Sequence, residues 1–271
     1  MTIQSLVDVI DLNVRFAAHD VLKNVSLDIR PGETVGLVGE SGSGKSTLGR
    51  AILGIGPVNG GRILFQGKDI GGLPPRKRGK EAAEIQAVFQ DPYTSLNPSM
   101  TIEDILIEPI IARKLATVQQ ARQRVRALLE QVALPSDAAG RFPREFSGGQ
   151  RQRVAIARAL ALSPRLIICD EPVSALDLST QARVLELFID IQERTGVSYL
   201  FVTHDLAVVR HISHRVAVMR RGEIVEFGDC DQVTARPAHD YTRRLLLSAP
   251  VADPVRQAER RAQLHTLQAG A

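Results

Sequence analysis

The sequence predicts an α/β fold whose core is a mostly parallel β-sheet, and three observations support this prediction. Apolar stretches rich in β-branched residues alternate with segments of helical composition along the 271-residue chain. A glycine-rich turn joins an early strand to a helix. In the second half of the chain, strands and helices again follow one another with short connections. Such alternation implies right-handed crossovers between parallel strands, so we expect helices to cover the sheet.

The expected elements fall into three blocks. The first contains strands at 5–10, 22–30 and 33–38, a helix from about 45, and strands near 61–65 and 86–89. A mainly helical block follows at about 101–162, and we expect it to be an insertion between two halves of the sheet. The last block contains strands at 165–170, 197–203 and 214–219 and helices at 178–194 and 205–211. A short helical segment and a polar tail follow.

The composition is that of a globular protein, with 44% apolar and 24% charged residues. A total of 34 basic and 30 acidic residues leaves a formal charge of +4, spread along the chain. The densest basic cluster, Arg76-Lys77-Arg78 with Lys80, stands among prolines and a glycine, and we interpret it as a solvated loop. Nucleic-acid-binding proteins usually gather their positive charge on one face. Nucleic acid is therefore not an expected partner.

The sequence lacks the signs of a membrane span, a metal cluster or a disulfide framework. No apolar run approaches the roughly 18–20 residues that cross a bilayer. The start contains Asp8 and Asp11 without a basic flank, unlike a secretory signal. Cys169 and Cys230 belong to no CxxC or mixed Cys/His cluster. We expect a cytosolic chain whose link to a membrane comes through a partner.

A phosphate-binding loop is predicted where the strand ending at Val38 runs into a helix. The pattern GxxxxGK[ST] is satisfied by Gly39-Glu40-Ser41-Gly42-Ser43-Gly44-Lys45-Ser46-Thr47. Glycines let the backbone wrap closely, so that amide N–H groups and a helix N-terminus face the phosphates. Lys45 would place its charge between the β- and γ-phosphates of ATP, and the Ser46 hydroxyl would bind Mg²⁺. The expected nucleotide contacts are Gly39, Ser41, Gly42, Gly44, Lys45, Ser46 and Thr47.

Two adjacent carboxylates, Asp170 and Glu171, follow the apolar strand 166–169. Ligands of open α/β sheets lie beyond the carboxyl ends of the strands, so these acids should face the phosphate-binding loop. Successive strand residues point in opposite directions, which gives the two acids different tasks. Asp170 should hold Mg²⁺, directly or through water, and Glu171 should polarise the water that attacks the γ-phosphate. The alternative is an ordinary solvated strand end.

The segment Phe146-Ser147-Gly148-Gly149-Gln150 resembles the LSGGQ signature of ATP-binding-cassette (ABC) ATPases, with Phe146 in place of Leu. Four further residues are similar, in the same order, to family elements: Phe16 to the aromatic that stacks on adenine, Gln90 to the Q-loop glutamine, Asp177 to the D-loop, and His204 to the switch histidine. Taken singly, each has an ordinary structural interpretation, and Phe16 would be a core residue about as often as a ligand. The resemblance covers about residues 1–248.

This resemblance implies an ABC nucleotide-binding domain at 1–235, with a RecA-like core, an N-terminal antiparallel β subdomain and a helical subdomain inserted at about 97–162. A short tail at 236–271 would follow. The implied catalytic residues are Glu171, His204 and Gln90, and the implied metal site contains Ser46, Gln90 and Asp170. Nucleotide would also contact Phe16, Ser147, Gly148, Gly149, Gln150 and Asp177. In the family, the signature closes over ATP held by a second subunit.

Further resemblance narrows the kind of ABC machine. Lys45 and Ser147 are 147 − 45 = 102 residues apart, which excludes the chromosome-organising and DNA-repair members. The segments at 89–98 and 170–179 are similar to those of oligopeptide, dipeptide and nickel uptake ATPases of the second-subunit type. The segment 236–242 resembles that family's PxHPYT element, with Asp240 replacing Pro. Many relatives continue into a cysteine-rich iron–sulfur segment, and this chain ends without those cysteines, so we expect no cluster.

The resemblance implies a peripheral subunit on the cytoplasmic face of the inner membrane. Its partners would be two transmembrane permeases, a second ATPase subunit, identical or not, and an extracytoplasmic solute-binding protein. The segment from Gln90 to about Arg113 should border a groove for a permease helix, and changes at Leu96 or Asn97 should uncouple transport. Two alternatives remain open: a catalytically decayed half of a heterodimer, and a regulatory or nucleic-acid-linked ABC ATPase.

Overall fold

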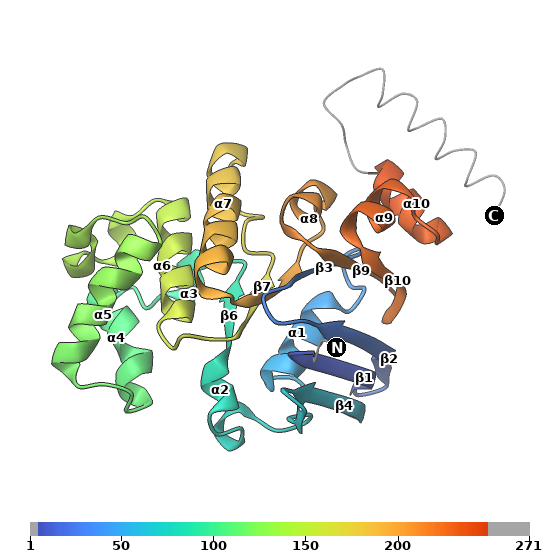
Figure 1. Cartoon of the computed structure of the whole chain (residues 1–271), viewed down its shortest axis with the longest axis horizontal. Helices are drawn as coiled ribbons and strands as arrows, with labels where there is room; N and C mark the ends of the chain where they lie inside the picture. The colour runs from blue at the N-terminus through green and yellow to red at the C-terminus, as the bar shows by residue number, and fades with distance from the viewer. Residues whose placement is uncertain (1–4, 249–271) are drawn as a thin grey trace.

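The computed structural model describes residues 5–248 and contains two β-sheets with helices around them (Figure 1). The larger sheet has six strands in the order β10-β9-β3-β8-β7-β6. Five of them run parallel, and β10 pairs antiparallel with β9 at one edge. The strands are β3 (Thr34–Val38), β6 (Ile85–Phe89), β7 (Leu166–Asp170), β8 (Ser198–Val202), β9 (Arg215–Arg220) and β10 (Glu223–Asp229).

The smaller sheet is antiparallel and has the order β2-β1-β4-β5. Its strands are β1 (Val7–Phe16), β2 (His19–Ile29), β4 (Gly60–Phe65) and β5 (Lys68–Asp69). Helix α1 (Lys45–Leu53) lies between the two sheets, where Leu48 and Ile52 are completely buried in an apolar cluster shared by both. This shared core fixes α1, and with it the loop that precedes it, against both sheets.

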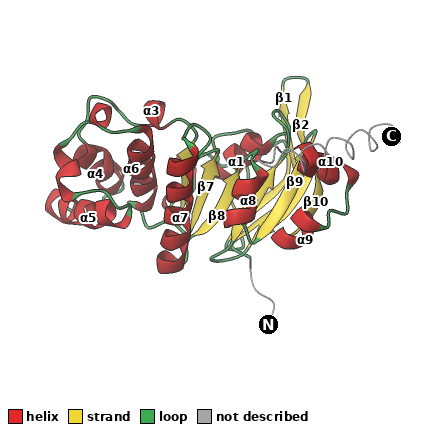
Figure 2. Cartoon of the chain, turned by 90° about the horizontal axis from the view of Figure 1, so that it is seen from above, coloured by secondary structure: helices red, strands yellow, loops and turns green. Residues whose placement is uncertain are grey.

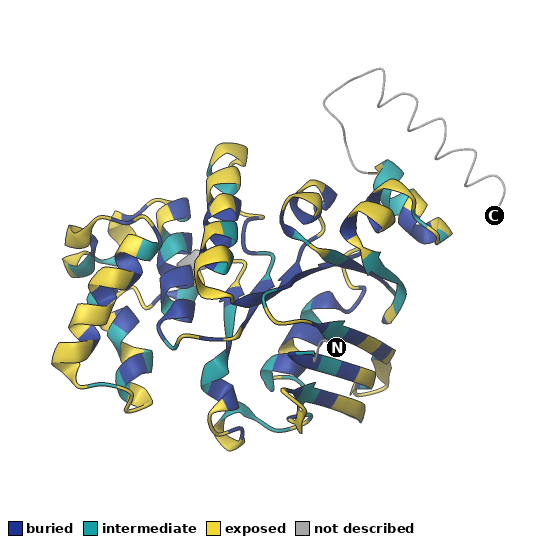
Figure 3. Cartoon of the chain, viewed as in Figure 1, coloured by how far each residue is buried: buried dark blue, intermediate teal, exposed yellow. Residues whose placement is uncertain are grey.

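A helical group follows β6 and precedes β7 in the chain, and it lies at one end of the large sheet (Figure 2). Its members are α3 (Pro92–Ser95), α4 (Ile102–Ala112), α5 (Val118–Gln131) and α6 (Gly148–Leu160). The remaining helices are α2 (Glu81–Glu84), α7 (Leu178–Thr195), α8 (Leu206–Ile212), α9 (Cys230–Ala235) and α10 (Asp240–Ser248). Buried residues, dark blue in Figure 3, lie along the strands of the large sheet and on one side of the helices around it. They form three clusters, and the largest joins the helical group to α7 and β8.

The predicted α/β class is confirmed, with an antiparallel sheet of N-terminal strands and a helical group inserted between β6 and β7, and the local differences have physical causes. Strand β10 was not predicted, because its backbone is held by pairing with β9 while most of its side chains are only half-buried. The boundary at residue 235 stays a prediction, and residues 249–271 lie outside the described part of the chain. Within residues 5–248, no helix combines the length and the apolar character that crossing a membrane requires.

The interpretation of the basic cluster as a solvated loop was wrong for Arg78. This side chain is only 2% exposed, whereas Arg76 and Lys77 lie on the surface. Its guanidinium donates hydrogen bonds to the carbonyls of Leu73 and, at the C-terminal end of α1, of Ile52. Burial lowers the pKa of Arg78 to about 10. Arg78 therefore satisfies the Ile52 carbonyl, which the last turn of α1 leaves without an intrahelical donor.

Candidate functional site

The phosphate-binding loop, residues 39–44, connects the carboxyl end of β3 to the N-terminus of α1. Gly42 and Gly44 have φ angles of 77° and 109°, which side-chain-bearing residues rarely adopt. A Cβ on Gly39 would lie 2.2 Å from the Met219 carbonyl oxygen, so the loop also needs glycine for space. No side chain caps α1 at Gly44. The first N–H groups of α1 are therefore available to an anion.

Lys45 lies inside the curve of this loop and is 6% exposed. Its ammonium donates hydrogen bonds to the carbonyl oxygens of Gly39 and Glu40, each at 2.8 Å. Burial lowers the pKa of Lys45, and the carboxylates of Glu171 and Asp170 oppose this effect. The loop thus holds a positive charge at the place where phosphate oxygens would enter.

Ser46 and Asp170 come together although they lie far apart in the chain. The Ser46 hydroxyl donates a hydrogen bond of 2.8 Å to Oδ1 of Asp170, across the contact between α1 and β7. Burial raises the pKa of the Asp170 carboxyl, while the Ser46 hydrogen bond and the Arg50 charge lower it. Oxygen ligands of this kind suit Mg²⁺, which usually keeps several water and phosphate ligands. The described residues contain no cluster of three His, Cys, Asp or Glu side chains that could hold a metal ion.

Glu171 and His204 follow the neighbouring parallel strands β7 and β8, in which Asp170 is paired with Val202. Their side chains meet at 3.2 Å between Oε2 of Glu171 and Nδ1 of His204. Glu171 has a left-handed backbone, with φ of 50°, and its N–H donates to the Val202 carbonyl at 2.9 Å. Such a conformation is uncommon outside glycine and is often found at functional sites. It turns the chain immediately after Asp170 and gives the two adjacent acids separate surroundings.

Gln90 and Asp170 line one cavity of about 430 Å³ beyond the carboxyl ends of β6 and β7. Arg50 lines it too, a residue that none of the predicted motifs contains. Its position four residues after Ser46 places both side chains on one face of α1, a signal available from the sequence. The structure therefore gathers Lys45, Ser46, Gln90, Asp170, Glu171 and His204 around one edge of the large sheet.

The signature residues lie elsewhere, at the N-terminus of α6. Ser147 caps this helix: its Oγ accepts the Gln150 N–H at 3.4 Å, and Gln150 Oε1 accepts the Ser147 N–H at 2.9 Å. Gly149 is needed for packing, because a Cβ there would lie 2.2 Å from Cγ2 of Thr180 on α7. Gly148 begins the helix. Figures 1 and 2 both show α6 in a different part of the molecule from α1.

Two further predicted residues are separate from the carboxylate edge. Asp177 caps α7 by accepting the Thr180 N–H at 3.0 Å and the Ser179 hydroxyl at 2.7 Å, and these hydrogen bonds lower its pKa. Phe16 ends β1 with 49% of its surface exposed, so it is not a core residue. The following strand approaches the phosphate-binding loop, since a Cβ on Gly44 would lie 2.7 Å from Cδ2 of Leu22.

Comparison with known proteins agrees with this geometry. The family model described as "ABC transporter" matches residues 22–174. Glutathione import ATP-binding proteins GsiA of Escherichia coli K12 and Shigella boydii are 52% identical over 243 residues, which is 90% of this chain. The chain spans 39% of the length of these relatives.

Among solved structures, cbiO1 of Clostridium perfringens, part of the ABC transporter complex cbiONQ, is similar with a TM-score of 0.77. It is 29% identical, and the match covers 86% of this chain and 92% of that one. A dimeric post-hydrolysis state of the cassette MJ0796 bound to ADP and Pi has a TM-score of 0.73 and is 31% identical. This match covers 83% of this chain and 98% of that one. The family model spans more than half of the chain, and the chain belongs to the ABC transporter family, as its signature segment predicted.

Proposed function

We propose that this chain is the ATP-hydrolysing subunit of an ABC importer that takes up peptides, or nickel and related small solutes. The observation that carries the proposal is the meeting of Ser46 with Asp170 and of Glu171 with His204 beside the open N-terminus of α1. A phosphate-binding loop alone serves many reactions. A loop flanked by one metal-binding carboxylate and one carboxylate–imidazole pair is suited to attack by water on a bound phosphate.

Each residue at this edge has a task that follows from its surroundings. Backbone N–H groups of 42–45 and the Lys45 ammonium would bind the phosphates, and Ser46, Asp170 and Gln90 would hold Mg²⁺, which neutralises charge on the phosphate oxygens. Glu171 would orient the attacking water and accept its proton, while His204 holds the Glu171 carboxylate and contacts the γ-phosphate. Phe16, exposed at the end of β1, would stack on the adenine.

The proposed cycle requires two cassettes arranged head to tail. Ser147, Gly148 and Gly149 provide a second anion-binding helix start, far from the loop of the same chain. Bound ATP would be enclosed between Lys45 of one subunit and Ser147 of the other, with Gln150 and Asp177 at the same interface. The dimeric state of the related cassette MJ0796 with ADP and Pi supports this arrangement. Hydrolysis would remove one anion contact per site and let the subunits separate.

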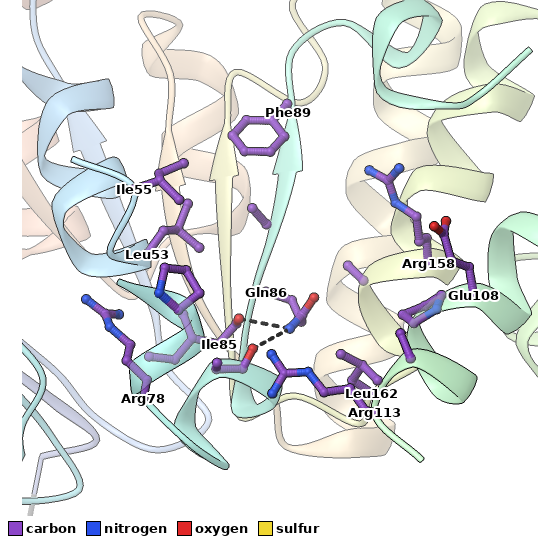
Figure 4. A pocket seen from close by; sticks show the side chains of 16 residues that line it. Leu53, Ile55, Arg78, Ile85, Gln86, Phe89, Glu108, Arg113, Arg158 and Leu162 are labelled. Atoms are coloured by element: carbon purple, nitrogen blue, oxygen red, sulfur yellow. Dashed lines mark hydrogen bonds between the residues drawn. The ribbon is translucent and has the colours of Figure 1, made fainter. Parts of the chain in front are cut away.

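Import and the peptide-like cargo are supported by the relatives named glutathione import ATP-binding proteins. The partners we propose are two permeases, a second ATPase subunit and a solute-binding protein, which would place the chain peripherally on the cytoplasmic side of the membrane. A groove of about 510 Å³ runs along β6, with Ile55 on one side and Glu108 and Arg113 on the other (Figure 4). We propose this groove as the contact for a permease helix.

The lining of this groove provides better residues for testing the permease contact than Leu96 and Asn97. Leu96 is 2% exposed in the apolar core of the helical group, so replacing it would disturb folding as well as docking. Asn97 is exposed, and its side chain accepts the Ser99 N–H at 3.0 Å within the loop. Glu108 and Arg113 line the groove itself, and their substitution is the better probe of coupling.

Mixing two inactive variants tests the proposed enzyme. Lys45→Ala removes the phosphate contact of one subunit, and Ser147→Arg blocks the site that a subunit offers to its neighbour. Each variant alone should lose ATP hydrolysis in a single-turnover assay. Mixed in equal amounts, about half of the dimers contain one subunit of each variant, and each of these has one intact composite site out of two. About a quarter of the wild-type activity per dimer should therefore return. A mixture that stays inactive, beside an active wild type, would show that the site is not shared between chains.

A further inference from the structure

The C-terminal helix α10 contacts the phosphate-binding loop directly. Tyr241, in the first turn of α10, is only 4% exposed. Its hydroxyl oxygen accepts a hydrogen bond of 3.2 Å from the backbone N–H of Glu40, the second residue of the loop. The two residues are 201 positions apart in the chain. The matched family range, residues 22–174, does not include α10.

The Glu40 residue is therefore held from two directions. Its carbonyl oxygen accepts a hydrogen bond from the Lys45 ammonium at 2.8 Å, and its N–H is bound by Tyr241. Both contacts fix the same turn of a loop whose glycines would otherwise allow many conformations. Tyr241 thus restrains the backbone next to the group that would receive the phosphates.

Tyr241 is rigid enough to act as such a restraint. Its ring belongs to an apolar cluster with Val38, the residue before the loop, and the Arg220 guanidinium carbon lies 5.0 Å from the ring centroid. The preceding backbone is also fixed, because the Glu226 carboxylate of β10 accepts the N–H groups of Ala238 at 2.8 Å and His239 at 3.1 Å. The hydroxyl is consequently presented to the loop by an element anchored on the large sheet.

We propose that Tyr241 is a positioning residue that preorganises the phosphate-binding loop, so that the segment after residue 235 sets the affinity for nucleotide. This inference rests on the proposed function in that it takes ATP as the ligand. A loop that is ordered before binding loses less conformational entropy when the phosphates arrive, and affinity rises accordingly. Without the hydroxyl, the Glu40 N–H would lose its protein partner, and Glu40 would be held only through its carbonyl, which accepts hydrogen bonds from Lys45 and from the Ser43 N–H.

Substitution Tyr241→Phe tests the inference in the full chain, because it keeps the buried ring and removes only the hydroxyl. The dissociation constants of fluorescent ATP and ADP analogues should increase about three- to tenfold, the range expected for one hydrogen bond. Turnover at saturating ATP should stay close to that of the wild type, since no group at the carboxylate edge is altered. The melting temperature without nucleotide is measured alongside.

Tyr199→Phe is the matched control. The Tyr199 hydroxyl also makes one buried hydrogen bond, of 3.1 Å to the Phe188 carbonyl, but Tyr199 pairs with Thr34 at the opposite end of β3 from the loop. This variant should have a lower melting temperature and unchanged nucleotide affinity. A second variant, Glu226→Ala, leaves Tyr241 in place and releases the backbone before it, so its affinity should fall in the same direction by a smaller factor.

Each outcome bears on one of the two proposals. Wild-type affinity in Tyr241→Phe, within twofold, would overturn the inference, and so would an equal loss in Tyr199→Phe, which would indicate general loosening. If Tyr241→Phe fails to fold, Glu226→Ala decides: unchanged affinity in that variant overturns the inference. A wild-type chain that binds no nucleotide would instead overturn the proposed function.

Discussion

Two Glu–His pairs in residues 5–248 have similar geometry and different settings. Glu171 and His204 meet at 3.2 Å, and Glu186 and His211 meet at 2.8 Å. The first pair follows two buried parallel strands, and its Glu171 side chain is 21% exposed. The second pair joins the outer faces of α7 and α8, and its Glu186 side chain is 66% exposed. The contact itself therefore does not mark a functional site.

What distinguishes the two pairs is their surroundings. Glu171 is turned by a left-handed backbone beside Asp170, and its charge acts on the Lys45 ammonium in the phosphate-binding loop. Glu186 lies on a solvated helix surface, where water and salt weaken such interactions. A residue type acquires a special role here through burial and neighbours. The same substitution at like residues in unlike places should therefore have different effects.

The largest difference is expected between Glu171→Gln and Glu186→Gln. Loss of a positioned base typically lowers a rate by about 10²–10⁴. Glu171→Gln should lose ATP hydrolysis by that factor and keep ATP affinity, because the loop and the Ser46–Asp170 contact are unchanged. Glu186→Gln should hydrolyse ATP at the wild-type rate. Single-turnover assays and binding titrations on both variants measure this, and full turnover by Glu171→Gln would remove that residue from its proposed role.

A second comparison concerns arginines of one basic cluster. Arg78→Ala would leave carbonyls of Leu73 and Ile52 without their donor and a cavity in its place. The free energy of unfolding should fall by about 2–4 kcal/mol, in the range of severe buried substitutions. Arg76→Ala, at an exposed position, should change it by less than about 0.5 kcal/mol. Denaturant unfolding measures the stability of both variants. Equal stability of the two would contradict the buried structural role of Arg78.

The smallest effect on stability is expected from Asp170→Asn, with Asp190→Asn as its control. Burial raises the pKa of Asp170, so its ionised form is less favourable in the fold than in the unfolded chain. Protonated Asp170 therefore stabilises the fold at pH values below the pKa of this group in the unfolded chain. This stability is lost as the pH rises through the pKa of Asp170 in the folded chain. At neutral pH, Asp170→Asn should therefore raise the melting temperature of the nucleotide-free chain slightly.

The same change should weaken Mg²⁺-dependent ATP binding, since it removes the proposed metal ligand. Asp190 is an exposed partner of Arg194 at 2.7 Å on α7, so Asp190→Asn should neither stabilise the chain nor affect nucleotide. Thermal melts with and without Mg-ATP separate the two effects. A lower melting temperature for nucleotide-free Asp170→Asn would contradict the reasoning from burial.

Much of the fold and of the site could be predicted because the signals are local. The phosphate-binding loop needs glycines at fixed positions, and the apolar run ending at Asp170 has the pattern of a buried strand. Strand β10 was missed since half-buried side chains give a weak pattern. Arg50 was missed because the cavity that it shares with Gln90 forms only in the folded chain.

The sequence by itself determined the α/β class, the family, and which residues could bind phosphate or a metal, since these depend on short patterns of backbone freedom and residue chemistry. The tertiary structure alone decided that Arg78 is buried and that Tyr241 holds Glu40. Such contacts join positions as far as 201 residues apart. They arise from the order of strands in the sheet and from the packing of helices on it, which no short stretch of sequence encodes.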